Sequence, residues 1–424
     1  MLPLFEKEIK KGTGIPLLLL KRNILNPNDQ MTEIIIDNII NTKSYDPRCE
    51  ELRGDYLYEI VLNYENKEKI YSKITDIFEG MEENTYSENQ IASFVINMVK
   101  DNLYPKEKYL KKIDWYIKHY RTQYVPGIDE IIEIDLINGI KHFAKIFGEI
   151  IVDEKEHNIS EYLFFKEVNG FTKDELLKIM KGEKDYYIDA YFGFINRADQ
   201  KKQIYKRPTV EEIISKYKSG KFYPLCGWIK KANEEDIKKL SDLYIGLKDI
   251  ELKRKLLIAF SNTRIMVDEN YLWKELKRTR NMSYKSAIIE ALKNFEHDTV
   301  KILINDYYQS EETKIAALKA FVKYADIKDE GMLEYYFENL NVNEIHSITT
   351  YFIECETIKA FSFYKKILRY LYDKNPCSIC RKEIIEAMFK ANCLDENVLS
   401  EIEYDSDKDI RKIANDYKSK KHSA

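Results

Sequence analysis

Stretches with apolar residues on one helical face alternate along the chain with residues that favour helix starts. Ser87–Gln90, Thr172–Glu175 and Thr209–Glu212 each fit a capping box, in which two side chains satisfy backbone donors of the first helical turn. Helix ends are expected near Gly182 and Gly220, because glycine readily adopts the left-handed conformation that closes a helix. These signals predict packed helices of about 10–15 residues.

Before residue 240 the predicted helices share no clean repeat register. Asp46 places a capping side chain before Pro47 and predicts another helix start. The segment 52–80 predicts a helical hairpin, and the stretches 124–135 and 221–228 are candidate joints. None of these connections is of low complexity, so we expect one continuous body. It divides by pattern into an N-terminal helical region, a middle helical region and a repeat region, covering residues 1–125, 126–240 and 241–424.

The later part of the chain repeats one pattern. A basic residue is followed six positions later by alanine and then by a large apolar residue. The copies lie about 30 residues apart, with twice that gap before the last one. A degenerate copy is therefore expected around 345–355, and a worn copy at 408–414. Chance matches among amphipathic helices are the alternative. The four clear copies are Lys253–Phe260, Lys285–Leu292, Lys314–Phe321 and Arg381–Met388.

Packing explains why alanine would recur at one position. A small side chain lets two helices approach closely, while the neighbouring Ile, Leu and Phe residues fill the seam. The basic residue is expected on the solvated side. Each unit needs a second helix, such as one beginning after Asp298, and one pair cannot bury its apolar face without neighbours. The alanines predicted to occupy equivalent positions are Ala259, Ala291, Ala320 and Ala387.

Paired helices of this length, with short polar turns, resemble HEAT-type repeats. The resemblance is clearest over 249–340 and extends weakly to 420. The aspartate and arginine typical of such units are mostly absent, apart from Asp409 and Arg411, so armadillo-like stacking fits nearly as well. The resemblance implies an all-α fold, an α-α superhelix of stacked helix pairs. Such solenoids present extended concave surfaces to their partners.

Composition agrees with a helical protein and argues against several classes. Glycine and proline are scarce, at 14 and 9 residues, which favours long helices over turn-rich β structure. The net charge of −4 lacks the basic excess usual in nucleic-acid binders. No stretch is long and apolar enough for a membrane helix or a signal peptide. We therefore expect a cytoplasmic protein with reduced cysteines.

Candidate chemistry is sparse in this sequence. Cys377, Cys380 and Cys393 form the most noticeable cluster, but a structural zinc needs four ligands, and only His346 or Cys355 could serve as a distant fourth. A redox pair of the thioredoxin type would need a preceding strand, and the pair is expected to fill the core instead. The common hydrolase, nucleotide-binding and dinucleotide-binding motifs are absent. The sequence predicts no catalytic residue, no metal and no cofactor.

Two stretches are candidates for binding a partner. Along one predicted helix, Tyr116, Tyr120 and Tyr124 form a stripe. Aromatic and cationic side chains together can anchor a protein or stack on bases. The alternative is an aromatic stripe that packs on the next helix. The second stretch is the basic run Lys274–Arg280, for which the alternative is a solvated helical face. The same holds for Lys201, Lys202, Lys206 and Arg207. The candidate partner-binding residues are Trp115, Tyr116, His119, Tyr120, Arg121, Lys274, Lys277, Arg278 and Arg280.

These features predict a non-enzymatic scaffold that presents a curved helical surface to a protein partner. The alternative is a nucleic-acid-binding HEAT-like protein, at its extreme a DNA glycosylase of the alkylation-repair type. Those enzymes pair a catalytic aspartate with tryptophans that face a basic groove. Here only Trp115 has an adjacent aspartate, Asp114, so no catalytic residue is carried over.

Overall fold

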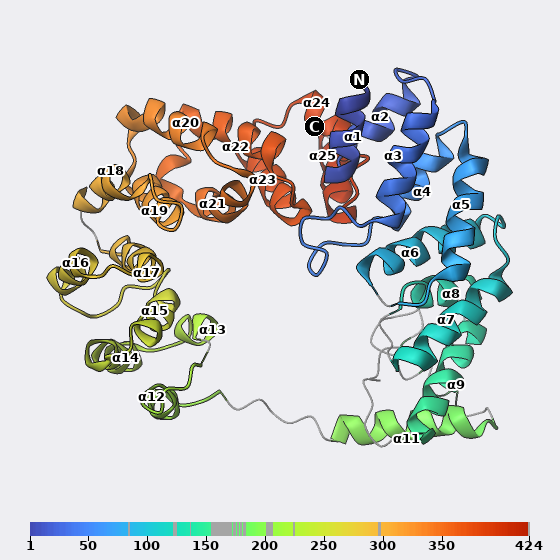
Figure 1. Cartoon of the computed structure of the whole chain (residues 1–424), viewed down its shortest axis with the longest axis horizontal. Coiled ribbons are helices and arrows are strands. Elements are labelled where there is room, and N and C mark those ends of the chain that lie inside the picture. Colours follow the sequence, from blue (N-terminus) through green and yellow to red (C-terminus); the bar gives the residue numbers. More distant parts are fainter. Residues whose placement is uncertain are drawn as a thin grey trace. The chain divides into compact units, whose positions relative to one another are not determined.

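The computed structural model of the chain is helical throughout (Figure 1). It describes residues 1–83, 85–121, 125–135, 137–153, 172, 175, 178, 180, 184–200, 207–223, 225–295 and 298–422. Over these ranges no strand is present, and helices that follow one another in the sequence pack as neighbours. The predicted all-α class is therefore confirmed.

The chain forms two compact units. The first unit comprises Met1–Ile204 together with Asp395–Ala424, and the second comprises Tyr205–Leu394. The C-terminal segment joins the first unit through polar contacts with its N-terminal helices. Arg411 lies 2.8 Å from Glu59, and Lys408 lies 2.8 Å from Asp55. The stretch 408–414, expected as a worn repeat copy, thus packs with the first unit.

The helices of the first unit enclose a continuous apolar core. The predicted hairpin over 52–80 is present as α4 and α5, and α6 packs against both of its helices. The long helices α9 and α11 pack closely along each other. The helices are α1 Leu2–Lys11, α2 Ile15–Lys21, α3 Asp29–Ile40, α4 Gly54–Leu62, α5 Lys67–Gly80, α6 Tyr86–Lys100, α7 Lys106–Tyr120, α8 Ile128–Asp135, α9 Ile137–Asp153, α11 Tyr186–Gln200, α24 Glu396–Ile402 and α25 Lys408–His422.

Two of the four helix starts predicted from caps are confirmed, and two are corrected. Capping boxes are present at Thr209 with Glu212 and at Thr172 with Glu175, while Gly182 lies outside the described residues. The start predicted at Ser87 is wrong by two residues, because Thr85 forms the capping box with Glu88. The Ser87 hydroxyl instead accepts a hydrogen bond from the Thr42 backbone.

Asp46 does not begin a helix, which corrects the second predicted start. Residues 46–50 form a single turn. The Asp46 carboxylate is taken by Arg48, whose backbone and guanidinium both donate to it at 3.0–3.2 Å. A carboxylate held by a charged side chain is less available as a cap, and the residues that follow have no apolar face to pack.

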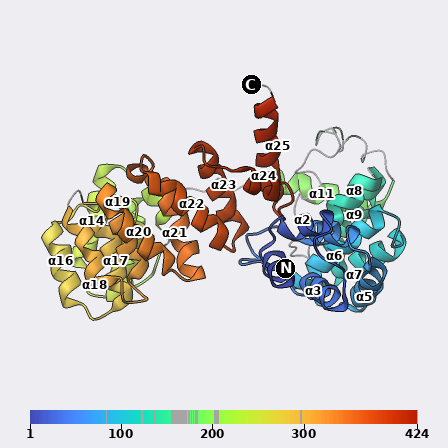
Figure 2. The ribbon, with the colours of Figure 1, turned by 90° about the horizontal axis from the view of Figure 1, so that it is seen from above.

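The helices of the second unit alternate between two layers. Helices α15, α17, α19, α21 and α23 pack one on the next, and α16, α18, α20 and α22 lie beside them (Figures 1 and 2). The bounds are α12 Val210–Lys218, α13 Cys226–Ile229, α14 Glu234–Gly246, α15 Ile250–Ala259, α16 Glu269–Arg278, α17 Met282–Leu292, η2 Asp298–Ile302, α18 Leu303–Tyr307, α19 Lys314–Tyr324, η3 Ile327–Asp329, α20 Glu330–Glu338, α21 Val342–Glu354, η4 Glu356–Ile358, α22 Ser362–Lys374 and α23 Ser378–Lys390.

The four alanines of the sequence pattern are buried on α15, α17, α19 and α23, and none is more than 5% exposed. The helix α21 covers the stretch 345–355 and lies between α19 and α23, where the degenerate copy is expected. Alanine therefore recurs at buried positions along this row, as the packing argument requires.

The basic residue of the pattern is not on the solvated side, and this expectation is wrong. Lys253 is 7% exposed and Arg381 is fully buried. Lys253 pairs with Glu275 at 3.0 Å, and Lys314 pairs with Glu344 at 3.0 Å. A cation that is removed from water needs a partner, and at Lys253 and Lys314 this position links a helix of the row to a neighbouring element.

Candidate functional site

The exposed end of α7 carries an aromatic and cationic surface. Trp115 is 39% exposed, and His119 one turn later stacks on it with the ring centroids 4.7 Å apart. The ammonium of Lys112, one turn earlier, lies 5.1 Å from the centroid of the indole. Trp115, His119 and Lys112 are called the Trp115 surface below. Lys112 was missed by sequence reasoning, although its spacing of three residues places it on the same helical face.

The other predicted residues of α7 support this surface instead of forming it. Tyr116 is only 2% exposed and stacks on Tyr120 inside the first unit. The Tyr120 hydroxyl donates to the Glu82 carbonyl at 2.6 Å. Arg121 ends the helix in the left-handed conformation, with a φ of 52°. Tyr124 lies outside the described residues, so the predicted tyrosine stripe is described only in part.

A groove of about 470 Å³ borders the Trp115 surface, and it carries both signs of charge. Glu79 accepts hydrogen bonds from Lys108 and Tyr104, each at 3.0 Å. These bonds, that from Lys108 foremost, lower the pKa of Glu79, so its carboxylate stays charged near neutral pH. The groove is lined by Glu79, Glu82, Tyr104, Lys108, Lys111, Lys112 and Trp115.

The basic residues predicted around α16 lie together at the surface. Lys274, Lys277 and Arg278 occupy one face of the helix, and Arg280 follows its end. All four are exposed, and none of them forms an ion pair with any residue that the structure describes. The opposite side of α16 buries Leu272 and Leu276. These four cations are called the basic face of α16 below.

Several other cations of the second unit are paired with acids. Lys319 lies 3.0 Å from Glu290, which links α19 to α17, and Lys366 lies 2.7 Å from Glu334, which links α22 to α20. Lys301 likewise pairs with Asp329. The basic cluster at Lys201, Lys202 and Lys206 lies outside the described residues. Arg207 is directed to the backbone carbonyls of Trp228 and Lys231.

A buried polar network joins α14 to α17 beneath the basic face of α16. The Lys253 ammonium donates to the Tyr271 hydroxyl at 2.9 Å and pairs with Glu275. Tyr284 also donates to Glu275, at 3.1 Å, and exchanges a hydrogen bond with Tyr244. Burial lowers the pKa of Lys253, but the bonds to Tyr271 and Glu275 outweigh burial and raise it above the usual value. The network holds its charges in place and offers no neutral base.

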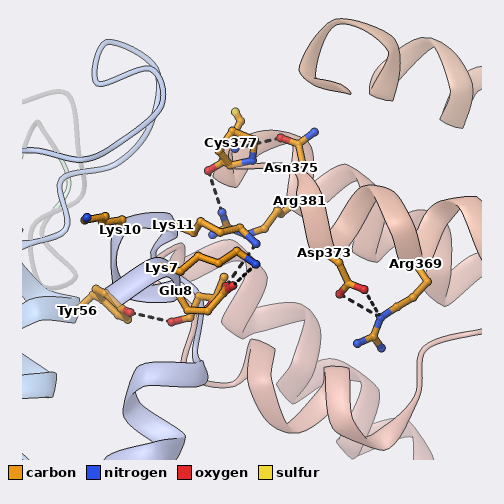
Figure 3. Close-up of polar contacts among 12 residues, drawn as sticks. Lys7, Glu8, Lys10, Lys11, Tyr56, Arg369, Asp373, Asn375, Cys377 and Arg381 are labelled. Atoms are coloured by element: carbon orange, nitrogen blue, oxygen red, sulfur yellow. Dashed lines mark hydrogen bonds and ion pairs between the residues drawn. The ribbon is translucent and has the colours of Figure 1, made fainter. Parts of the chain in front are cut away.

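The second unit also brings together a cluster that the sequence separates widely. Cys377, Cys380 and His346 each place one sulfur or nitrogen atom within 4.8 Å of the others. Sequence reasoning treated His346 as distant, because it lies 34 residues before Cys380. The contact of α21 with α23 removes that separation. Asn375 accepts a hydrogen bond from the Cys377 backbone and is drawn with it in Figure 3.

The tryptophans do not assemble the arrangement that the glycosylase alternative requires. Asp114 lies 2.9 Å from the His142 ring, and the groove beside Trp115 has mixed charge. Trp228 is buried and donates to the Pro208 carbonyl, whereas the Trp273 indole donates to Glu269 on its own helix. None of the three lies in a uniformly basic groove among the described residues.

Comparisons with known proteins identify no family for this chain. No protein-family model, curated protein or solved structure matches this chain. Each helix in the described part of the chain is too short or too polar to cross a lipid bilayer.

Proposed function

We propose that this chain is a HEAT-like helical-repeat protein that binds a protein partner and has no catalytic activity of its own. The stacked row from α15 to α23, with buried alanines at recurring positions, supports the repeat interpretation. Stacked repeats spread a contact surface over several helices, so sharp catalytic motifs are not expected.

The observation that carries the proposal is the basic face of α16. Four exposed cations lie together without acidic partners among the described residues, whereas Lys314, Lys319 and Lys366 elsewhere in the second unit are paired with acids. Like charges held side by side repel one another, and an anionic partner would relieve that repulsion. An acidic segment of a protein partner would match this face.

A protein fits this surface better than a nucleic acid. A duplex is held by cations spread along a path of phosphates. Here Lys301, Lys314 and Lys319, farther along the same unit, are already paired with carboxylates. The Trp115 surface in the first unit is also bordered by acids. Tryptophan and arginine are frequent energetic anchors of protein interfaces.

Affinity purification from the native host after nuclease treatment tests the proposal. A variant with Lys274, Lys277, Arg278 and Arg280 changed to Ser removes the basic face. A control variant removes the same charge from exposed lysines elsewhere in the second unit, namely Lys230, Lys238, Lys328 and Lys365. Proteins retained by the wild type and the control, but lost from the basic-face variant, are the expected result. Equal recovery with all three baits would contradict the proposal.

Binding to labelled duplex or single-stranded DNA is the complementary measurement. We expect none near physiological salt. Tight binding that weakens steeply with added salt, and that disappears in the basic-face variant, would instead establish the nucleic-acid alternative.

A further inference from the structure

The cluster of His346, Cys377 and Cys380 has the composition and the spacing of a metal site. Its three candidate ligand atoms all lie within 4.8 Å of one another, and the Cys380 sulfur lies 3.2 Å from His346 Nδ1. Ligand atoms around a tetrahedral zinc ion, with bonds of about 2.0–2.3 Å, lie roughly 3.5 Å apart. Only small side-chain movements would be needed to close around an ion.

The two cysteines are positioned by the start of a helix. Cys377 is the N-cap of α23, and Cys380 lies in its first turn. A helix begun at this point turns both side chains toward the same region, which is why a spacing of two intervening residues recurs in zinc sites. Both cysteines are at most 5% exposed.

A second set of contacts fixes the loop that carries Cys377. The Asn375 side chain accepts from the Cys377 backbone at 3.0 Å and donates to the Thr349 hydroxyl at 2.9 Å. Asn375 and Thr349 are both fully buried. Thr349 lies on α21, one turn after His346. The ligands on α23 and the ligand on α21 are therefore held in register by a buried amide and hydroxyl, as outer contacts do in known metal sites.

Both sulfur atoms must lose their protons before they can bind an ion. A side-chain hydrogen bond with Cys377 and burial raise the pKa of the Cys380 thiol above its usual value. Arg381 directly follows Cys380, is fully buried and donates to the Pro376 carbonyl at 3.1 Å, which ties the first turns of α23 to the loop before it (Figure 3). The positive charge that converts the thiols to thiolates would therefore come from the metal ion itself.

We propose that His346, Cys377 and Cys380 bind one zinc ion through Nδ1 and the two sulfur atoms. Both thiols lose their protons to solvent when the ion binds. The fourth position is left to water or to an external ligand. Thiolate and imidazole are soft to intermediate ligands, which favours zinc over magnesium or calcium. The ion would join α21 to α23 within the second unit.

Titration of the reduced full-length protein with Co²⁺ is the direct test. We expect one equivalent to bind with a thiolate-to-cobalt charge-transfer band, and added Zn²⁺ to abolish that band. Cys380→Ser and His346→Gln should each weaken binding by at least about tenfold. Cys355→Ser and Cys393→Ser are matched controls in the same unit and should bind like the wild type, because neither sulfur belongs to the cluster.

Circular dichroism of each variant distinguishes loss of a metal-binding side chain from loss of the fold. His346→Gln is the most informative variant, since His346 is half-buried and its loss spares the buried cysteines. Folded, fully reduced wild-type protein that gives no charge-transfer band would overturn the proposal. So would binding that is unchanged in both ligand variants. A Cys377–Cys380 disulfide in protein that binds no metal would instead identify a redox pair.

Discussion

Lys293 shows at the scale of single residues how charge is buried in the second unit. It is 2% exposed, its ammonium lies 2.6 Å from Glu290, and it also lies 4.4 Å from the centre of the Tyr351 ring. Burial lowers its pKa in spite of the carboxylate. Glu290 has a second cation, Lys319, at 3.0 Å. The Glu290 carboxylate thus neutralises two lysines, and it keeps Lys319 as a partner when Lys293 is removed.

Replacing Lys293 by Met should therefore cost little or even stabilise the protein. We expect a change within about 1 kcal/mol of wild type, since the apolar stem is kept and the desolvated charge is removed. The matched variant Glu290→Gln leaves two cations without their anion and should lose about 3 kcal/mol. Urea unfolding measures both free energies. A large loss for Lys293→Met with none for Glu290→Gln would contradict this interpretation.

The lowered pKa also sets the sign of a pH dependence. Because the folded pKa of Lys293 lies below its unfolded value, the unfolded chain holds the proton more strongly. Folding then becomes more favourable as pH rises from the folded pKa toward about 10.4. Over this pH interval the unfolding free energy of the wild type should rise relative to that of Lys293→Met. A shift in the opposite direction would contradict the burial argument.

At the scale of elements, the pair α9 and α11 depends on one close approach. A side-chain carbon added at Gly148 would lie 1.8 Å from the Tyr187 carbonyl oxygen. At Gly193, on the other helix of the pair, no described atom beyond its own stretch of helix lies within 4 Å of the equivalent position. Glycine is thus required at the first site by the neighbouring backbone, whereas no described neighbour requires it at the second.

Alanine at these two glycines should have opposite effects on stability. Gly148→Ala must push α9 from α11, and we expect a loss of about 2 kcal/mol. Gly193→Ala should gain about 0.4–1 kcal/mol, because alanine restricts the unfolded chain and favours helix. Thermal or urea unfolding of the two variants provides the comparison. Equal effects at both positions would show that α9 and α11 do not approach as described.

Local signals predicted the elements better than the contacts between them. The Thr209 capping box involves residues three apart, so its sequence suffices. The Asp46 turn was missed because Arg48 competes for the carboxylate. Lys253 was placed in solvent because its partner Glu275 comes from another helix. A lysine can extend to water or bury its stem, and its own sequence does not distinguish the two.

The candidate metal site was missed for a related reason. Its two cysteines are visible as a pair, but His346 lies 34 residues before Cys380 and joins them only when α21 packs on α23. The repeat spacing contained a signal, since it placed a helix at 345–355 beside the last clear copy. The exposure of Trp115 and the burial of Tyr116 likewise depend on how α7 packs in the first unit.

At the scale of the whole molecule, the two compact units present different surfaces. The first carries the Trp115 surface and a groove of mixed charge. The second carries the basic face of α16 above a buried network that joins four helices. The buried network holds α16 against its neighbours, so its exposed cations are displayed by a fixed helix. Rigid display reduces the entropy lost when a partner binds.

Site-specific photo-cross-linking in the native host tests whether the basic face of α16 contacts a protein partner. A photoreactive residue replaces Lys277 on the basic face of α16, and the control replaces Lys238, an exposed lysine on α14. The proposed function predicts a discrete protein adduct from position 277 that resists nuclease and is absent from position 238. An adduct that nuclease removes, or the same adducts from both positions, would contradict it.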